Sequence, residues 1–176
     1  MVRDGNGLIW IGTFDGLQRY DGYGSRIYRN IPNEPHSIPS NNISSLLVDR
    51  KKRLWIGTYE SGISLYDALR DRFVNFPPRM NDSAWVPGAR TVNAIIEDRK
   101  GDLWLGTSSG VVRVRMPADA RSLDPDSLER GIRFEAYHLG SPRNVAPDLC
   151  EREDGRIVIA SDSGLFLFEP TTRTLS

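Results

Sequence analysis

The stretch Arg53-Leu54-Trp55-Ile56-Gly57-Thr58 determines the fold, because the chain contains it in several variants. Three related stretches occur elsewhere, LIWIGT at residues 8–13, DLWLGT at 102–107 and RIVIAS at 156–161. Measured at the tryptophan position, which Val158 occupies in the last copy, successive copies lie 45, 49 and 54 residues apart. A period of about 40–50 residues is typical of β-propeller blades, so the repeat predicts a propeller.

The residues around each copy alternate between apolar and polar types, as strand residues do. Upstream lies a D-x-x-G pattern or a close variant, which suits a tight turn. Downstream a second glycine opens another alternating run, as in GISLYD from Gly62. With one further run on either side, each unit contains four antiparallel strands, named a to d from the centre of the propeller outward.

We predict an all-β protein, a β-propeller of about four blades with four antiparallel strands each. The predicted blades are residues 1–41, 42–90, 91–144 and 145–176. The first blade is expected to be incomplete, without strand a, and the last blade without strand d. Because a closed seven-bladed ring at this period needs roughly twice this length, the chain is interpreted as a fragment of a seven-bladed propeller. A closed four-bladed ring is the alternative.

The repeated tryptophan has a structural explanation. A single blade cannot bury both of its faces, so neighbouring blades must stack and present flat apolar residues to each other. Tryptophan meets this need, since it can bury about 200 Å². The residues assigned to this structural role are Trp10, Trp55, Trp104, Gly12, Gly57 and Gly106. Val158 is expected to pack less tightly than the tryptophan it replaces.

Composition argues against several functions. Lys plus Arg and Asp plus Glu both total 23, so the formal net charge is zero and nucleic acid is not an expected partner. Cys150 is the single cysteine, which excludes an internal disulfide, and no apolar run reaches the roughly 18 residues of a membrane span. His36 and His138 belong to different copies and lack metal-ligand spacing. No catalytic residue, metal or cofactor is therefore expected.

The unit I-x-x-D-x-x-G-x-L-W-I-G-T-x-x-G-L-x-x-Y-D resembles the two-component regulator propeller repeat. The resemblance covers nearly the whole chain and is closest at residues 49–67 and 98–111, whereas the fourth copy has V-I-A-S in place of W-I-G-T. The family occurs in the extracytoplasmic sensor regions of bacterial hybrid histidine kinases and related diguanylate cyclases. The resemblance implies a ligand-sensing input domain of a membrane-bound signalling protein, located in the periplasm, although no signal peptide is expected in this chain itself.

Candidate ligand-binding residues lie in the loops that differ between copies, because those residues are not needed for stacking. In propellers the d-to-a and b-to-c loops share one face. Trp85, the tryptophan outside the repeat, lies in a polar loop bounded by prolines and suits the stacking of a sugar ring. The candidate residues are Trp85, Arg90, Asn33, Glu34, Asn41, Tyr59, Glu60 and Arg143, and the b-to-c loops also contain Phe14, Asp15 and Asp162. The alternative is that Trp85 folds back to cap its own blade.

Three functions remain open at this point. The first is a sensor that binds a small molecule or oligosaccharide, with any catalysis in a separate kinase or cyclase module. The second is a protein-interaction or assembly propeller whose partner is a second copy of the chain or the remaining blades, with a membrane reached only through a parent protein. The third is a propeller lyase, a class of enzyme that shares this architecture.

Overall fold

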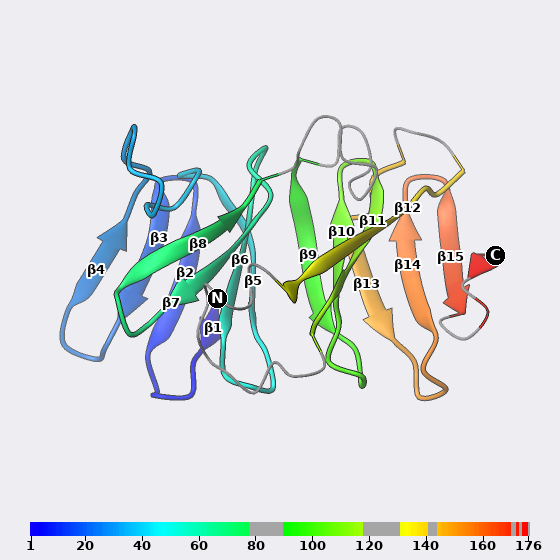
Figure 1. The fold of residues 1–176 in the computed structure, drawn as a ribbon, viewed down its shortest axis with the longest axis horizontal. Helices are drawn as coiled ribbons and strands as arrows, with labels where there is room; N and C mark the ends of the chain where they lie inside the picture. The colour runs from blue at the N-terminus through cyan, green and yellow to red at the C-terminus, as the bar shows by residue number, and fades with distance from the viewer. Residues whose placement is uncertain (78–89, 118–130, 141–143, 170–171, 173, 176) are drawn as a thin grey trace.

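The computed structural model describes residues 1–77, 90–117, 131–140, 144–169, 172 and 174–175. The elements in this part of the chain are strands, and they form four antiparallel sheets of four strands each, which succeed one another in chain order. Figure 1 shows the sheets side by side, with the first at the left and the last at the right. The predicted all-β propeller architecture with four-stranded blades is confirmed.

Each sheet is one blade, and its strands follow the order a to d. Blade 1 contains β1 (Val2–Arg3), β2 (Ile9–Thr13), β3 (Gly16–Tyr20) and β4 (Ser25–Tyr28). Blade 2 contains β5 (Ile43–Val48), β6 (Leu54–Thr58), β7 (Ile63–Asp67) and β8 (Arg72–Phe76). Blade 3 contains β9 (Val92–Glu97), β10 (Leu103–Thr107), β11 (Gly110–Arg115) and β12 (Arg133–Tyr137). Blade 4 contains β13 (Asp148–Glu151), β14 (Ile157–Ser161), β15 (Gly164–Glu169) and β16 (Thr174–Leu175).

The two terminal blades correct one expectation. The sequence predicts that blade 1 lacks strand a and blade 4 lacks strand d, yet both positions are occupied by strands of two residues, β1 and β16. Val2 pairs with Trp10 in the first blade, and Leu175 pairs with Phe168 in the last. Two residues are too few to show an alternating pattern, so the sequence alone could not reveal these strands.

The core is divided among three clusters of buried side chains, one at each junction between successive blades. In every case the strand b tryptophan packs onto the strand b residues of the next blade. Trp10 lies with Leu54 and Ile56, Trp55 with Leu103 and Leu105, and Trp104 with Ile157 and Ile159. All three tryptophans are fully buried. Blades 1, 2 and 3 therefore each insert their tryptophan into the following blade.

The glycine two residues after each tryptophan permits the same junctions. A Cβ atom on Gly12 would lie 2.6 Å from Cγ2 of Ile43, and one on Gly106 would lie 2.5 Å from the carbonyl oxygen of Ala146. Both neighbours belong to the start of the next blade. Because real Cβ contacts are not this short, glycine lets the inner strand of the next blade approach the backbone closely.

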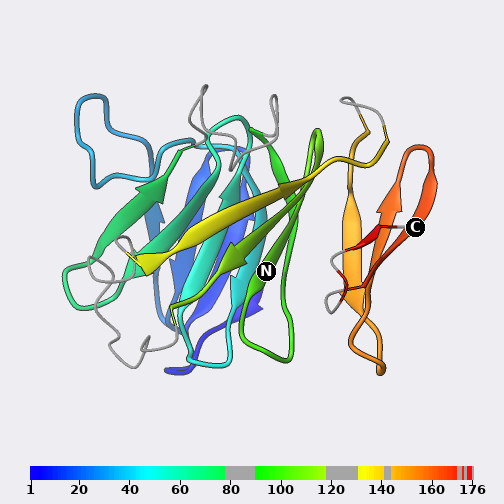
Figure 2. The same cartoon turned by 45° about the vertical axis from the view of Figure 1, so that its right-hand side comes forward.

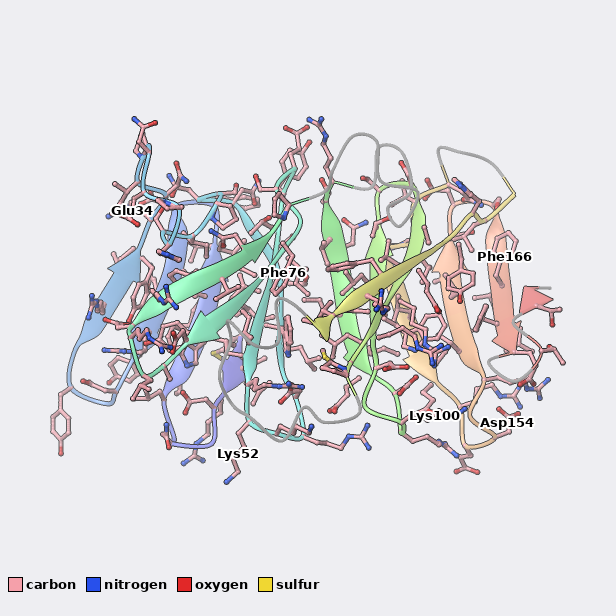
Figure 3. The ribbon with its side chains drawn as sticks, viewed as in Figure 1. Glu34, Lys52, Phe76, Lys100, Asp154 and Phe166 are labelled. Atoms are coloured by element: carbon pink, nitrogen blue, oxygen red, sulfur yellow. The ribbon has the colours of Figure 1, made fainter. Side chains whose placement is uncertain are left out.

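Two opposite ends of the blades carry the connections. We call the end that carries the b-to-c turns and the d-to-a loops the loop face, and the end that carries the a-to-b and c-to-d turns the turn face. Figure 3 shows Glu34 on the loop face, and Lys52, Lys100 and Asp154 on the turn face. Figure 2 shows the same cartoon turned, with the residue 30–42 loop projecting beyond its blade. In the part of the chain that the structure describes, no helix is long and apolar enough to cross a membrane.

Candidate ligand-binding face

The loop face is held together by backbone hydrogen bonds between neighbouring blades. The amide of Gly16 in the first b-to-c turn donates to the carbonyl of Asn41 at 2.7 Å. In the second b-to-c turn, Tyr59 donates to the carbonyl of Asn42, and Gly62 to that of Arg90, each at 2.9 Å. The b-to-c turns of blades 1 and 2 are therefore bonded through Gly16 and Gly62 to the segments that lead into the following blades, while the bond of Tyr59 to Asn42 lies within blade 2.

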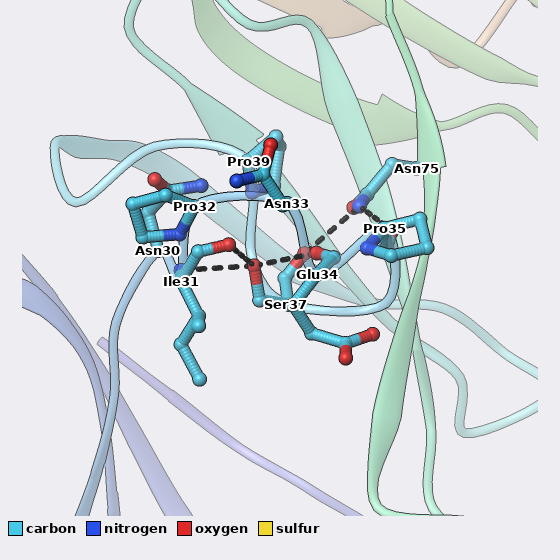
Figure 4. Close-up of a pocket in the computed structure, with 9 residues that line it drawn as sticks. All are labelled: Asn30, Ile31, Pro32, Asn33, Glu34, Pro35, Ser37, Pro39 and Asn75. Carbon is cyan, nitrogen blue, oxygen red and sulfur yellow. Dashed lines mark hydrogen bonds between the residues drawn. The ribbon is translucent and has the colours of Figure 1, made fainter.

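A hollow of about 400 Å³ lies on this face, where the loop between blades 1 and 2 meets strand β8 (Figure 4). It is lined by Asn30, Ile31, Pro32, Asn33, Glu34, Pro35, Ser37, Pro39 and Asn75. Ile38, which is fully buried, fixes the base of the loop in the core. The lining contains amide, hydroxyl and carboxylate groups together with three prolines, a mixture that suits a small polar ligand.

Most polar groups of the hollow are already bonded to one another. The side-chain amide of Asn75 donates to the carbonyls of Pro35 and Ser37, at 2.9 and 2.8 Å. The hydroxyl of Ser37 donates to the carbonyl of Glu34 at 2.9 Å, and Oδ1 of Asn41 accepts from the amide of Asn30 at 2.7 Å. These bonds shape the loop, so fewer groups remain for a ligand.

Asn33 and Glu34 are exposed polar residues of the hollow, as is Asn30. Asn33 has a φ of 63°, in the left-handed region that Asn tolerates better than most residues. Oε1 of Glu34 accepts from the amide of His36 at 3.2 Å, which leaves the other carboxylate oxygen for solvent or a ligand. The two residues are thus placed at the mouth of the hollow by backbone geometry.

A second group of exposed residues lies on the b-to-c turns. Phe14 and Tyr59 occupy the same repeat position, four residues after the tryptophan, and are 87% and 50% exposed. An acid follows each aromatic residue, Asp15 in blade 1 and Glu60 in blade 2. Blades 3 and 4 have no aromatic residue at this position. Exposed aromatic rings offer flat apolar surface, and the neighbouring carboxylates offer hydrogen-bond acceptors.

The acid of the first turn belongs to an ion pair. Arg29 donates from Nε and Nη2 to the two carboxylate oxygens of Asp15, at 3.0 and 2.7 Å. Hydrogen bonding to Arg29, followed by the charge of the same guanidinium, lowers the pKa of Asp15 below its ordinary value. The carboxylate therefore remains ionised at neutral pH.

The structure separates the predicted ligand-binding residues into two groups. Asn33 and Glu34 line the hollow, whereas Asn41, Tyr59, Glu60 and Arg90 do not. Asn41 is bonded to Gly16 in the first b-to-c turn, whereas Tyr59, Glu60 and Arg90 lie where the second b-to-c turn meets the segment leading into blade 3. The amide of Glu60 donates to Thr91 Oγ1 at 3.3 Å. Trp85 and Arg143 fall outside the described residues. Sequence reasoning missed Asn75, whose signal is a lone amide within the apolar run RFVNF.

The histidines occupy separate parts of the molecule. His36 is exposed, and Nε2 of its ring lies 3.1 Å from Nη1 of Arg72. His138 is exposed at the end of β12. Within the described residues, no cluster of three or more His, Cys, Asp or Glu side chains could hold a metal ion.

Stacked four-stranded antiparallel sheets, joined through a repeated tryptophan, define the class of this chain as a β-propeller. The family model described as "two component regulator propeller" matches residues 37–60 and 87–109 of this chain. The curated protein "Histidine kinase P4" from Formosa agariphila is 36% identical over 67 residues, a match that covers 36% of this chain and 5% of the relative.

Solved structures share the fold. The extracellular domains of the putative hybrid two-component systems BT3049 and BT4673 from B. thetaiotaomicron superpose with TM-scores of 0.71 and 0.72, at 21% and 23% identity. They match 100% and 99% of this chain, which spans 24% of each. Virginiamycin B lyase from Staphylococcus aureus matches 99% of this chain and is itself covered to 53%, with a TM-score of 0.67 and 12% identity. At these identities the likeness concerns the fold alone.

Proposed function

We propose that this chain forms part of the ligand-sensing input domain of a bacterial membrane-bound signalling protein, and that its loop face binds a carbohydrate. The observation that carries the proposal is the placement of Phe14 and Tyr59, exposed aromatic residues at the same repeat position in neighbouring blades. Repeat residues that serve stacking are buried, so two large exposed rings need another explanation. Binding of a sugar ring supplies one.

Carboxylates next to these rings add specificity to the proposed site. Asp15 and Glu60 follow the aromatic residues directly, and Asn41 and Arg90 lie on the backbone bonded to the same turns. Hydroxyl groups of a sugar can donate to the acids while the ring stacks on the aromatic faces. Trp85 and Arg143, which lie outside the described residues, remain predicted contributors.

The repeat family and the names of the relatives support the sensing part of the proposal. The two solved relatives are described as extracellular domains of putative hybrid two-component systems, and the curated relative as a histidine kinase. A periplasmic location is proposed on the same basis. In this proposal the propeller binds, and any catalysis belongs to a kinase or cyclase module of the parent protein. Binding would act by shifting the balance between two arrangements of that protein.

Titration with a glycan panel, followed by tryptophan fluorescence, tests the proposal. Because Trp10, Trp55 and Trp104 are fully buried, the response to a ligand should come mainly from Trp85. Replacement of Trp85 by Phe should remove the signal, and Trp85→Ala should weaken the binding of a glycan found in the panel. Equal affinity of Trp85→Ala and wild type in a label-free assay would remove Trp85 from the site.

A second candidate is an assembly module, and exposed apolar residues on the two terminal blades favour it. Leu165 in β15 is 76% exposed and Ile27 in β4 is 40% exposed. Large exposed apolar residues on strands favour association with other sheets. Light scattering tests this function, because an assembly module should form oligomers that Leu165→Glu dissociates. A chain that remains monomeric across the concentration range would speak against it.

A further inference from the structure

A second cavity lies on the turn face, at the junction between blades 1 and 2. Its volume is about 540 Å³, within the range of small-molecule sites. It is lined by Asp4, Gly5, Asn6, Lys51, Lys52, Arg53, Leu54, Tyr66, Asp67, Ala68, Leu69 and Arg70. These residues come from the a-to-b turns of both blades and from the c-to-d turn of blade 2. The cavity therefore lies at the opposite end of the blades from the candidate carbohydrate site.

The other two junctions are bridged at this level by arginines. Arg50 of blade 2 pairs with Glu97 of blade 3 at 3.1 Å and donates to the carbonyls of Asp98 and Arg99. The equivalent residue of blade 3, Arg99, pairs with Glu151 of blade 4 at 2.9 Å. Arg99 also donates to the carbonyls of Arg152 and Glu153, at 2.8 and 2.7 Å. In blades 2 and 3, an arginine of the a-to-b turn thus reaches across to the next blade.

The junction between blades 1 and 2 lacks both members of this bridge. Gly5 occupies the position of Arg50 and Arg99, and Val48 occupies the position of the two glutamates. Gly5 carries no side chain, and the side chain of Lys52 lies where a Cβ on Gly5 would stand. The cavity is therefore a specific departure from the repeat.

Arg53 lines this cavity with an incompletely bonded guanidinium. Its side chain is only 6% exposed, and Nε donates to Oδ2 of Asp49 at 2.5 Å. The guanidinium carbon lies 5.7 Å from the centroid of the Trp55 ring, which covers one face of the group. Nη1 is buried and has no hydrogen-bond partner within the described part of the chain. A buried donor without a partner is costly, so an acceptor that reached Nη1 after a shift of the side chains that cover it would be favoured.

The electrostatic balance of the cavity favours an anion. Four cationic residues, Lys51, Lys52, Arg53 and Arg70, line it together with two acids, Asp4 and Asp67. Both acids already accept hydrogen bonds, Asp4 from the indole of Trp10 at 2.9 Å and Asp67 from Arg70 at 3.0 Å. Because Arg53 is paired with Asp49 and Arg70 with Asp67, the positive charge that an anion would meet comes mainly from Lys51 and Lys52.

The walls of the cavity are mainly apolar. Leu54 is buried at its base, and Ala68 and the 87% exposed Leu69 lie at its rim on the c-to-d turn. Exposed leucine on a turn is explained when a ligand covers it. The ligand should therefore carry a compact apolar body, such as a ring, in addition to its negative charge.

From this geometry we propose that the turn-face cavity between blades 1 and 2 binds a small carboxylate whose apolar body lies against Leu54, Ala68 and Leu69. The carboxylate lies near Lys51 and Lys52, and it accepts from Nη1 of Arg53 once the side chains that cover this atom shift. This site is independent of the proposed carbohydrate site, because it lies on the opposite face and uses none of the same residues.

Titration of phenylacetate and of its neutral counterpart phenylacetamide, followed by NMR chemical shifts, tests the site. Phenylacetate should bind saturably, with shifts confined to the turns of blades 1 and 2. Phenylacetamide should bind roughly tenfold more weakly, because it lacks the charge-assisted hydrogen bond. Equal binding of the two probes, or no saturable binding of phenylacetate, would overturn the proposal.

Two variants close the cavity without touching the core. Gly5→Arg restores the bridging arginine of the other junctions, since its Cβ would meet only the flexible side chain of Lys52. Ala68→Trp fills the cavity from an exposed position. Both should abolish phenylacetate binding while the unfolding midpoint stays near that of wild type. Retained binding in both would show that the probe binds elsewhere.

Arg53 is tested with a matched control. Arg53→Gln should lower the affinity for phenylacetate roughly tenfold or more. Arg113→Gln removes another buried arginine, which is bonded to Asp102 and lies 5.1 Å from the centroid of Trp104, yet does not line the cavity. Arg113→Gln should therefore bind like wild type. Equal losses in both variants would mean that the effect is structural and would contradict the assignment of Arg53.

Discussion

The indole Nε1 of Trp55 donates to Oδ2 of Asp49 at 3.0 Å, so the two most regular positions of the repeat are bonded to each other. The same bond joins Trp10 to Asp4 and Trp104 to Asp98, each at 2.9 Å. In blade 4 both partners are absent together, since Arg152 and Val158 occupy the two positions. The Asp thus serves the turn and also satisfies the buried indole.

Replacing Asp49 by Ala should destabilise the chain by about 3–5 kcal/mol, because it removes the acceptor of a buried ion pair and a buried indole. Asp49 is 3% exposed and accepts from Arg53 as well as from Trp55. Urea unfolding measures the loss. As a control, Asp154→Ala removes an exposed carboxylate that pairs with Arg156 and should leave the midpoint nearly unchanged. Equal midpoints for the two variants would contradict the role given to Asp49.

Trp104→Ala should cost about 3–5 kcal/mol, as expected for a large aromatic residue removed from a packed core. Its ring centroid lies 4.8 Å from that of Phe168 in the next blade, so the loss falls on the junction between blades 3 and 4. Val158→Ala, at the equivalent position of blade 4, should cost at most about 2 kcal/mol. Chemical denaturation of both variants gives the comparison. A Val158→Ala variant as unstable as Trp104→Ala would show that blade 4 depends equally on this position.

Gly57→Ala should destabilise the chain by roughly 1–3 kcal/mol through overpacking. The added Cβ would meet Oγ of Ser45 and would lie 3.0 Å from the Cβ of Val92, the first residue of β9 in blade 3. Gly24→Ala is the matched control, because nothing lies within 4 Å of its added Cβ. Thermal unfolding of both variants is sufficient. If Gly57→Ala and Gly24→Ala unfold at the same temperature, the close approach of the blades at Gly57 does not restrict the residue at this position.

Asp71 should make stability depend on acid pH. Burial raises the pKa of its carboxyl, but hydrogen bonds from Tyr66 and Tyr28 and the charges of Arg26 and Arg19 outweigh burial and lower the pKa below its ordinary value of 3.8. The folded pKa lies below the unfolded one, so the stabilisation is complete above about pH 4 and declines as pH falls toward the folded pKa.

The Asp71→Asn variant tests this pH dependence. Asn tolerates the φ of 53° found at this position, so the turn should persist. The variant should be less stable at neutral pH and should lose less stability than wild type between about pH 4 and pH 2. Urea midpoints measured across this range provide the test. Parallel pH profiles for the two proteins would contradict it.

The blades could be predicted from sequence because each rests on local patterns. The spacing of Trp10, Trp55 and Trp104 and the alternation around them require no knowledge of distant contacts. The bond between Asp49 and Trp55 left a signal that the sequence analysis did not use, which is the joint loss of both residues in blade 4.

The candidate sites were harder to predict because non-local contacts shape them. The side chain of Asn75 bonds to the carbonyl of Pro35, forty residues earlier, and this contact sets the outline of the loop-face hollow. The turn-face cavity likewise depends on Gly5 and Val48. These two residues can be recognised as departures from the repeat only by comparison with the arginine bridges at the other two junctions. Neither feature has a local sequence pattern.

The most direct test of carbohydrate sensing is calorimetric titration of a glycan that binds wild type, repeated with the double variant Phe14→Ala/Tyr59→Ala and with Tyr23→Ala. Tyr23 is fully exposed but lies on the c-to-d turn of blade 1, at the opposite end from Phe14. The account predicts that the double variant loses at least about tenfold in affinity while Tyr23→Ala binds like wild type. Undiminished binding by the double variant would contradict the proposed carbohydrate site.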